Sequence, residues 1–265
     1  MSSTELHIAD GVATLALDRA DVHNAFNAEL ITELVCRLHE LATDPHVQFL
    51  VLTGNGRSFS AGADLHWMRA MATASEAENY ADACRLANLM RTLAFFPKPT
   101  LARVQGAAYG GGVGLVACCD IAIGVAEAKF GLTESKLGLA PAVISPYVIG
   151  AIGARQALRL FLTAAVFDAP AARDMGLLHA VVTAAELDAA VVREISLLRR
   201  AGPAAMHACK ELVARVNGRD EAGQRALDEE NARVIARLRV SAEGQEGLSA
   251  FLGKRDPIWS TVSSA

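Results

Sequence analysis

The pattern of apolar and polar positions changes from strand-like to helix-like within the first part of the chain. Residues 5–8 and 12–17 alternate in polarity on either side of Asp10-Gly11, which predicts a two-stranded hairpin. Asn27 can then cap a helix, because the apolar positions after it recur at helical spacing, at Leu30, Leu34, Leu38 and Leu41.

The same alternation of strand and helix continues to about residue 195. Ser75 and Glu78 have the spacing of a capping box, which predicts a helix running towards Phe95. Other expected elements are strands at 49–52, 100–104 and 120–124, a short helix opening at Gly110, and a helix from the capping box Thr183/Glu186 to about Arg200. Strands that alternate with helices indicate an α/β core.

Beyond Pro203 the pattern is helical only, in long charged segments that reach about Gly253. We therefore expect two regions, a core at 1–195 and a helical C-terminal region at 196–265, with no linker between them. The longest uncharged stretch, 137–154, contains two prolines and several glycines. A buried loop followed by a short helix is expected there rather than a membrane span.

Composition and charge exclude some classes of function. Hydrophobic residues make up 52% of the 265 residues, so a buried core is available and disorder is not expected. A net charge of −4 argues against a nucleic-acid-binding protein. No signal peptide is visible, which together with an odd number of cysteines indicates a reducing cytoplasm. Each cysteine lies in an apolar, helix-like stretch without zinc-like spacing and is expected to act as a small hydrophobic residue: Cys36, Cys84, Cys118, Cys119 and Cys209.

Two loops rich in small residues are the first candidates for chemistry. They lie at 58–65 and 110–114, and each follows a predicted strand and precedes a predicted helix. Backbone N–H groups at the start of a helix are unpaired and attract negative charge. Each loop could therefore aim one N–H at the same substrate oxygen and form an oxyanion hole. Spacing alone leaves open that the glycine run serves backbone packing, and it does not fit a dinucleotide-binding turn.

Several motifs in register make the chain resemble the crotonase superfamily, the enoyl-CoA hydratase/isomerase family. They are FSAGADLHWM at 59–68, VQGAAYGGGVGL and CCDIAI at 104–123, KFGLTESKLGLAP at 129–141 and EGLSAFLGKRDPIW at 246–259. The resemblance implies a spiral of repeated ββα units with C-terminal helices that build homotrimers, often paired as hexamers. It implies an acyl-CoA thioester substrate, with coenzyme A as part of the substrate, no separate cofactor and no metal.

The resemblance also implies roles for individual residues. Ala63 and Gly111 match the two oxyanion-hole donors, and Glu134 matches the family's second catalytic carboxylate. Phe251 and Lys254 match a helix that reaches the coenzyme of a neighbouring subunit, where the lysine would contact a phosphate. Positions that match the surroundings of the pantetheine and adenine groups, largely through backbone, are His23, Ala25, Ala61, Asp64 and Leu65, with His66 next to them.

Some of these residues have simpler interpretations. Glu134 could be a solvated loop carboxylate, Lys254 a charge at the end of a helix, and His66 an exposed surface residue. Asp120 looks like a catalytic acid, but we expect it to be a structural hydrogen-bonding group at the start of a strand.

Gly114 stands where many hydratases of this family have the first of two glutamates. Two carboxylates serve hydration because one activates water and the other protonates the α-carbon. With Glu134 alone, the chain could be a Δ3–Δ2 enoyl-CoA isomerase, or a hydratase in which Glu134 handles the water. The segment PAVISPYV at 141–148 favours the hydratase, because with Gly114 it resembles bacterial hydratases of 3-substituted glutaconyl-CoA.

Those hydratases act on 3-methylglutaconyl-CoA in leucine breakdown or on isohexenylglutaconyl-CoA in acyclic terpene breakdown. The remaining alternative is a member of the fold that binds an acyl-CoA without turning it over, because folds of this kind host unrelated functions.

Overall fold

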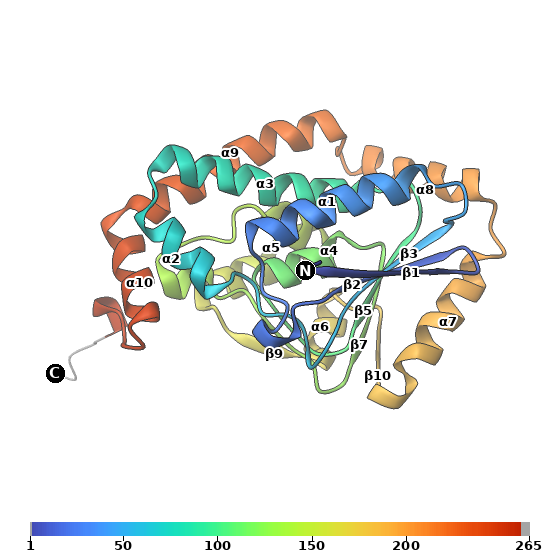
Figure 1. Cartoon of the computed structure of the whole chain (residues 1–265), viewed down its shortest axis with the longest axis horizontal. Coiled ribbons are helices and arrows are strands. Elements are labelled where there is room, and N and C mark those ends of the chain that lie inside the picture. The colour runs from blue at the N-terminus through green and yellow to red at the C-terminus, as the bar shows by residue number, and fades with distance from the viewer. Residues whose placement is uncertain (1, 261–265) are drawn as a thin grey trace.

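The computed structural model describes residues 2–260, which form sheets wrapped by helices (Figure 1). The predicted hairpin is present as β1 (Thr4–Ala9) and β2 (Val12–Leu17), paired antiparallel. Asp10 and Gly11 both have positive φ, at 49° and 76°, which a tight two-residue hairpin turn requires. The first prediction from the sequence pattern is therefore confirmed.

The described part of the chain contains two sheets, one of six strands and one of four. The further strands are β3 (Phe49–Gly54), β4 (Ser58–Ser60), β5 (Thr100–Val104), β6 (Ala107–Tyr109), β7 (Ile121–Val125), β8 (Lys129–Gly131), β9 (Val166–Asp168) and β10 (Ala180–Val182). The first sheet has the order β1-β2-β3-β5-β7-β10, and the second has the order β4-β6-β8-β9. Apart from β1–β2 and β8–β9, neighbouring strands are parallel.

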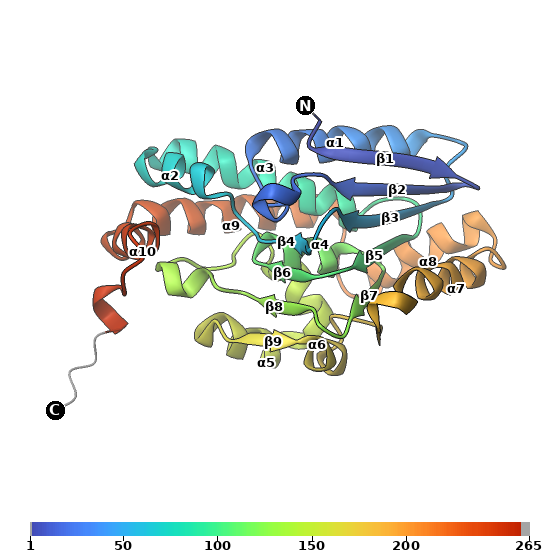
Figure 2. The same cartoon turned by 60° about the horizontal axis from the view of Figure 1, so that its bottom comes forward.

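From β3 to β8, consecutive strands alternate between the two sheets, and this alternation produces the spiral. β3 in the first sheet leads to β4 in the second, β5 leads to β6, and β7 leads to β8, and helices follow each pair. The helices are α1 (Ala28–Thr43), α2 (Leu65–Thr73), α3 (Glu76–Ala94), α4 (Gly111–Cys118), α5 (Ser145–Thr163), α6 (Ala169–Met175), α7 (Leu187–Leu198), α8 (Pro203–Val216), α9 (Glu221–Val240) and α10 (Ala242–Leu252). Figure 2 shows the strands stacked from β1 to β9, with α1 and α3 at one end of the stack and α5 and α6 at the other. The predicted fold of repeated ββα units is confirmed.

Helix α1 shows why the sequence pattern identified the core. The Asn27 side chain accepts a hydrogen bond of 2.9 Å from the backbone N–H of Leu30 and so caps the helix. The four predicted apolar positions are at most 2% exposed, namely Leu30, Leu34, Leu38 and Leu41. Burying one such side chain contributes about 1.5–3 kcal/mol, so this face holds α1 against the core, chiefly against α3.

The C-terminal helices fold back over the core of the same chain. α9 lies along α3 (Figure 1), and a buried ion pair between Arg91 and Asp228 joins the two helices. Asp120 accepts hydrogen bonds from Thr100 N (2.8 Å) and Lys210 Nζ (2.6 Å), so it ties α8 to β5. The predicted structural role of Asp120 is confirmed. The division of the chain at residue 195 falls within α7 and stays a prediction.

Of two further expectations, the one for 137–154 is confirmed and the one for the cysteines needs correction. The stretch 137–154 contains a loop followed by a short helix, as expected, because α5 is interrupted at Gly153, whose φ of 75° is not helical, and continues beyond it to Thr163. Cys36 and Cys209 are exposed, whereas Cys118 and Cys119 are buried as expected. Helical pattern alone does not tell which face of a helix meets the core. Among residues 2–260, no helix is both long and apolar enough to cross a membrane.

Candidate active site

Ala63 lies in the loop between β4 and α2, which is hydrogen-bonded to the segment before α1. Phe26 N donates to Gly62 O (2.6 Å), and Asp64 N donates to Phe26 O (2.8 Å). These bonds lie on either side of Ala63 and leave its N–H without an acceptor in residues 2–260. Asp64 Oδ1 accepts a hydrogen bond from His66 N (2.7 Å) and caps α2, which fixes the position where the loop ends and the helix begins.

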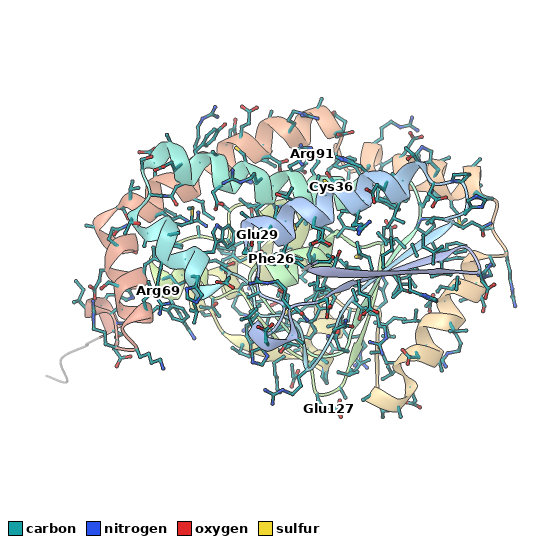
Figure 3. All side chains as sticks on the ribbon, viewed as in Figure 1. Phe26, Glu29, Cys36, Arg69, Arg91 and Glu127 are labelled. Carbon is teal, nitrogen blue, oxygen red and sulfur yellow. The ribbon has the colours of Figure 1, made fainter. Side chains whose placement is uncertain are left out.

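Gly111 is the first residue of α4, where a backbone N–H has no acceptor within its own helix. Gly110 precedes it with φ 48°, and its N–H donates to Gly131 O (2.9 Å). A Cβ on Gly111 would lie 2.8 Å from the ring of Phe26, whose label in Figure 3 is close to the middle of the molecule. Only glycine therefore fits at Gly111 without displacing Phe26.

The two loops are in direct contact. A Cβ on Gly62 would lie 3.0 Å from Tyr109 O, and a Cβ on Gly112 would lie 2.8 Å from Ser60 O. Ala63 and Gly111 therefore belong to loops that meet, each with an N–H that donates to nothing in the described chain. Two such donors suit an oxygen that gains negative charge.

Glu134 lies beside these loops, as the first residue of a 3₁₀ turn, η2 (Glu134–Leu137). A Cβ on Gly110 would be 3.0 Å from Glu134 Oε1. The residue is half-buried, but its Oε2 is fully buried and has no hydrogen-bond partner in the described structure. Burial raises the pKa of this carboxyl from 4.5 to about 7, although its own backbone N–H acts in the opposite direction. A carboxyl of this kind can both accept and return a proton near neutral pH, and it is not a solvated loop carboxylate.

The space beside Gly114 is filled by other side chains. A Cβ on Gly114 would overlap Ile144 Cγ2, and it would lie 3.0 Å from Ile144 Cβ and 3.2 Å from Met90 Cε. A glutamate at this position would require the start of α5 to move. The absence of a second carboxylate is therefore part of the packing between α4 and α5.

The residues matched to coenzyme binding gather around the same loops. Ala61 N donates to His23 O (2.9 Å), and His23 Nδ1 lies 3.0 Å from Ser58 Oγ. Ala25 and Asp64 are buried, whereas Leu65 is 49% exposed and His66 is exposed.

Sequence reasoning missed Arg19, which joins this group. Its guanidinium pairs with Asp64 Oδ2 at 3.0 Å and donates to Ala25 O. Burial raises the pKa of Asp64, but hydrogen bonds from His66 N and Arg19 outweigh it and hold this pKa below its usual value. No motif marked Arg19, because its partner is far along the chain.

Phe251 and Lys254 are at the end of α10, on the surface of the chain. Phe251 is 48% exposed, and Lys254 is exposed with φ 52°. The ion pair between Arg255 Nη1 and Glu246 Oε1 (2.6 Å) fixes the chain that follows α10. The structure therefore places both Phe251 and Lys254 at the surface, outside the core of their own chain.

A cavity of about 640 Å³ opens elsewhere, on a face of the first sheet. Residues of β1, β2, β3 and α7 line it, and it contains none of the residues matched to catalysis or coenzyme binding. Its charged residues include Arg103 and Asp188, which pair with each other at 2.7 Å. In residues 2–260, no cluster of three or more His, Cys, Asp or Glu side chains is arranged to hold a metal ion.

Comparison with known proteins agrees with this geometry. Residues 7–262 match the family model described as enoyl-CoA hydratase/isomerase. The chain is 46% identical to an enoyl-CoA hydratase from Shewanella pealeana, whose crystal structure aligns with a TM-score of 0.79 over 97% of this chain and 96% of that one. It is 32% identical to the 2,3-dehydroadipyl-CoA hydratase of Escherichia coli, over 93% of this chain and 94% of the relative. It is also 32% identical to the 1,2-epoxyphenylacetyl-CoA isomerase of Escherichia coli, over 95% of both chains.

Proposed function

The chain belongs to the enoyl-CoA hydratase/isomerase family, and on that basis we propose that it adds water to a 3-substituted glutaconyl-CoA. The observation that carries the proposal is the carboxyl of Glu134, whose Oε2 is buried without a hydrogen-bond partner in the described structure, next to the two loops with free N–H groups. In this proposal Ala63 and Gly111 bind the thioester oxygen and stabilise the enolate that forms when water adds to the β-carbon.

One carboxyl performs both proton transfers in this mechanism. Glu134 orients a water molecule, removes its proton as the oxygen bonds to the β-carbon, and returns a proton to the α-carbon of the enolate. A pKa of about 7 suits both steps, because the carboxylate and the carboxylic acid are then close in free energy. A 3-substituent stabilises the alkene, so the enzyme is expected to run readily as a dehydratase as well.

The acyl group is inferred from the resemblance of two motifs, which contain Gly114 and Ile144, to glutaconyl-CoA hydratases. In the structure the two motifs are in contact, because a Cβ on Gly114 would overlap Ile144 Cγ2. A second glutamate at Gly114 would also add a negative charge to a site that receives a carboxylate-bearing acyl chain. Two like charges 4 Å apart repel by about 4 kcal/mol at an effective dielectric constant of 20. The relative named 2,3-dehydroadipyl-CoA hydratase is named for an acyl chain that also ends in a carboxyl group.

The single carboxyl also fits a second candidate function, Δ3–Δ2 enoyl-CoA isomerisation. An isomerase needs the same oxyanion hole and one base that moves a proton between the α- and γ-carbons on one face, but no water. A relative named as an isomerase is among the similar proteins. The two reactions therefore differ in whether oxygen from water enters the product.

Coenzyme binding is proposed to involve two subunits of a homotrimer or a hexamer. The segment with Arg19, His23 and Asp64 would hold the coenzyme within one subunit, and the exposed Phe251 and Lys254 would reach it from the next. Lysine near a phosphate acts as a point charge, which suits the coenzyme's phosphate groups.

Incubation with glutaconyl thioesters in ¹⁸O-labelled water tests the proposed reaction. The panel contains a 3-methyl and a long isoprenoid 3-substituent, and loss of the conjugated enoyl absorbance measures turnover. Hydration predicts label in a 3-hydroxy product. Rapid shift of a 3-enoyl-CoA into conjugation, with no labelled alcohol from any glutaconyl ester, would show an isomerase instead. Binding of every thioester without turnover would show a non-catalytic member.

A further inference from the structure

The catalytic turn η2 and the last helix α10 are in close backbone contact, although more than a hundred residues separate them along the chain. A Cβ on Gly247 would overlap the Leu137 carbonyl group and would lie 2.8 Å from Leu137 Cα. A Cβ on Gly138 would lie 2.6 Å from Glu243 O and 3.0 Å from Gly244 N. Each element therefore presents a glycine to the backbone of the other, and both glycines are buried.

This contact supports a turn that has little structure of its own. η2 has four residues, from Glu134 to Leu137, and a 3₁₀ turn of this length has few internal hydrogen bonds. Leu139 N donates to Glu134 O at 3.1 Å, and Gly138 ends the turn with φ 66°. On the side away from α10, the Glu134 carboxyl lies against Gly110, in the small-residue loop at 110–114. The carboxyl is thus held between the loop at 110–114 and the turn η2, which packs on α10.

α10 itself is anchored at its start. The Ser241 side chain accepts from Gly244 N (3.0 Å) and caps the helix. A Cβ on Gly244 would lie 2.9 Å from Leu238 C, so α10 is packed tightly against the end of α9. Gln245 Nε2 donates to Ala72 O (2.9 Å) in α2, and Figure 1 shows α10 beside α2 at the same end of the molecule.

From these contacts we propose that α10 positions the Glu134 carboxyl of its own chain, with Gly247 and Gly138 as the positioning residues. This role is separate from any contact that Phe251 or Lys254 makes with a neighbouring subunit. It rests on the proposed function only in so far as Glu134 is the proton-transfer group. Glu134 and Leu137 are the two ends of one short turn. A backbone shift at Leu137 would therefore move Glu134 relative to the two small-residue loops at 58–65 and 110–114.

Gly247→Ala is the test, because the new methyl group meets backbone that cannot rotate away. Gly223→Ala is the matched control in α9, where the new Cβ would make an ordinary contact of 3.4 Å with Asp220 Oδ1. A misplaced catalytic group costs up to about a hundredfold in rate, so kcat of Gly247→Ala should fall about tenfold to a hundredfold. Affinity for 3-methylglutaryl-CoA, a saturated thioester measured by calorimetry, should stay within about threefold of wild type. Sedimentation should show an unchanged assembly.

The second readout does not depend on turnover. Carbon-13 NMR of proteins labelled at glutamate carboxyl groups, with the Glu134 signal assigned by its loss in Glu134→Gln, gives the Glu134 pKa directly. Burial is the main cause of the raised Glu134 pKa. The charged side chains near the contact between η2 and α10 do not contribute to the shift; they are Lys136, Glu243 and Glu246. When the turn shifts and water reaches the carboxyl, the pKa should fall from about 7 towards 4.5, by about one unit. Gly223→Ala should leave it unchanged.

These results separate the two proposals. If the pKa falls in Gly247→Ala but the wild-type protein turns over no enoyl thioester, the positioning role stands and the proposed reaction fails. An unchanged Glu134 pKa and kcat in folded Gly247→Ala overturn the positioning role, as does an equal loss of kcat and thioester binding. If Gly247→Ala does not fold, Gln245→Ala loosens α10 without a clash, because it removes the hydrogen bonds from Gln245 Nε2 to Ala72 O and Arg239 O. It should then lower kcat and the Glu134 pKa in the same direction, and wild-type values would overturn the proposal.

Discussion

Replacing Glu134 by glutamine should remove turnover and stabilise the folded protein at the same time. Burial raises the pKa of this carboxyl from 4.5 to about 7. At about 1.36 kcal/mol per pKa unit, keeping the ionised group in the folded site costs about 3 kcal/mol. Glutamine has nearly the same shape and carries no charge, so Glu134→Gln avoids this cost. Loss of the proton-transfer group should lower kcat by about a hundredfold to ten-thousandfold.

The stabilisation should depend on pH in a defined direction. Below about pH 4.5, the carboxyl is protonated in both the folded and the unfolded chain and has no effect on stability. Between about pH 4.5 and 7, the unfolded chain releases the proton while the folded chain retains it, so wild-type stability falls as pH rises. The difference between Glu134→Gln and wild type should thus be small at pH 4.5 and reach up to about 3 kcal/mol at pH 8.

Urea unfolding at several pH values, at one protein concentration, measures this difference, and loss of enoyl absorbance measures turnover. Glu127→Gln is the matched control, because Glu127 is exposed and Figure 3 labels it at the edge of the molecule. That control should change neither quantity. Near-normal turnover in Glu134→Gln would refute the catalytic assignment. A stability difference that is the same at pH 4.5 and pH 8 would refute the burial argument.

Three further predictions follow from the packing. Gly114→Glu should cost about 1–3 kcal/mol of stability because it overlaps Ile144, and it should not speed glutaconyl-CoA hydration; a clear gain in rate would contradict this. Asp64→Ala should lower the free energy of unfolding by about 2 kcal/mol, measured by thermal or urea unfolding, because α2 loses its cap and Arg19 loses its partner. It should also lower kcat/KM, and wild-type kinetics would show that the position of Ala63 does not depend on this cap. Truncation before Glu246 should dissociate the proposed homotrimer or hexamer and weaken thioester binding together, as measured by sedimentation and calorimetry. A monomer with wild-type affinity would exclude a shared coenzyme site.

The sequence by itself determined the elements that depend on neighbours a few residues away. The spacing of Leu30, Leu34, Leu38 and Leu41 placed α1, and the positive φ at Asp10-Gly11 is a property of those two residues. Motifs in register identified the family and picked out Glu134 and the two small-residue loops. The sequence also shows directly that position 134 is a glutamate and that position 114, a glycine, has no carboxylate.

Only the tertiary structure decided how these pieces act on one another. The strands of the second sheet have three residues each, which is too short for an alternating pattern to be recognised. Burial of Glu134 Oε2, the pairing of Arg19 with Asp64 and the contact of Gly247 with Leu137 join segments far apart in sequence. Local propensity acts over a few residues, whereas burial, and the pKa that follows from it, depend on every segment that packs around the group.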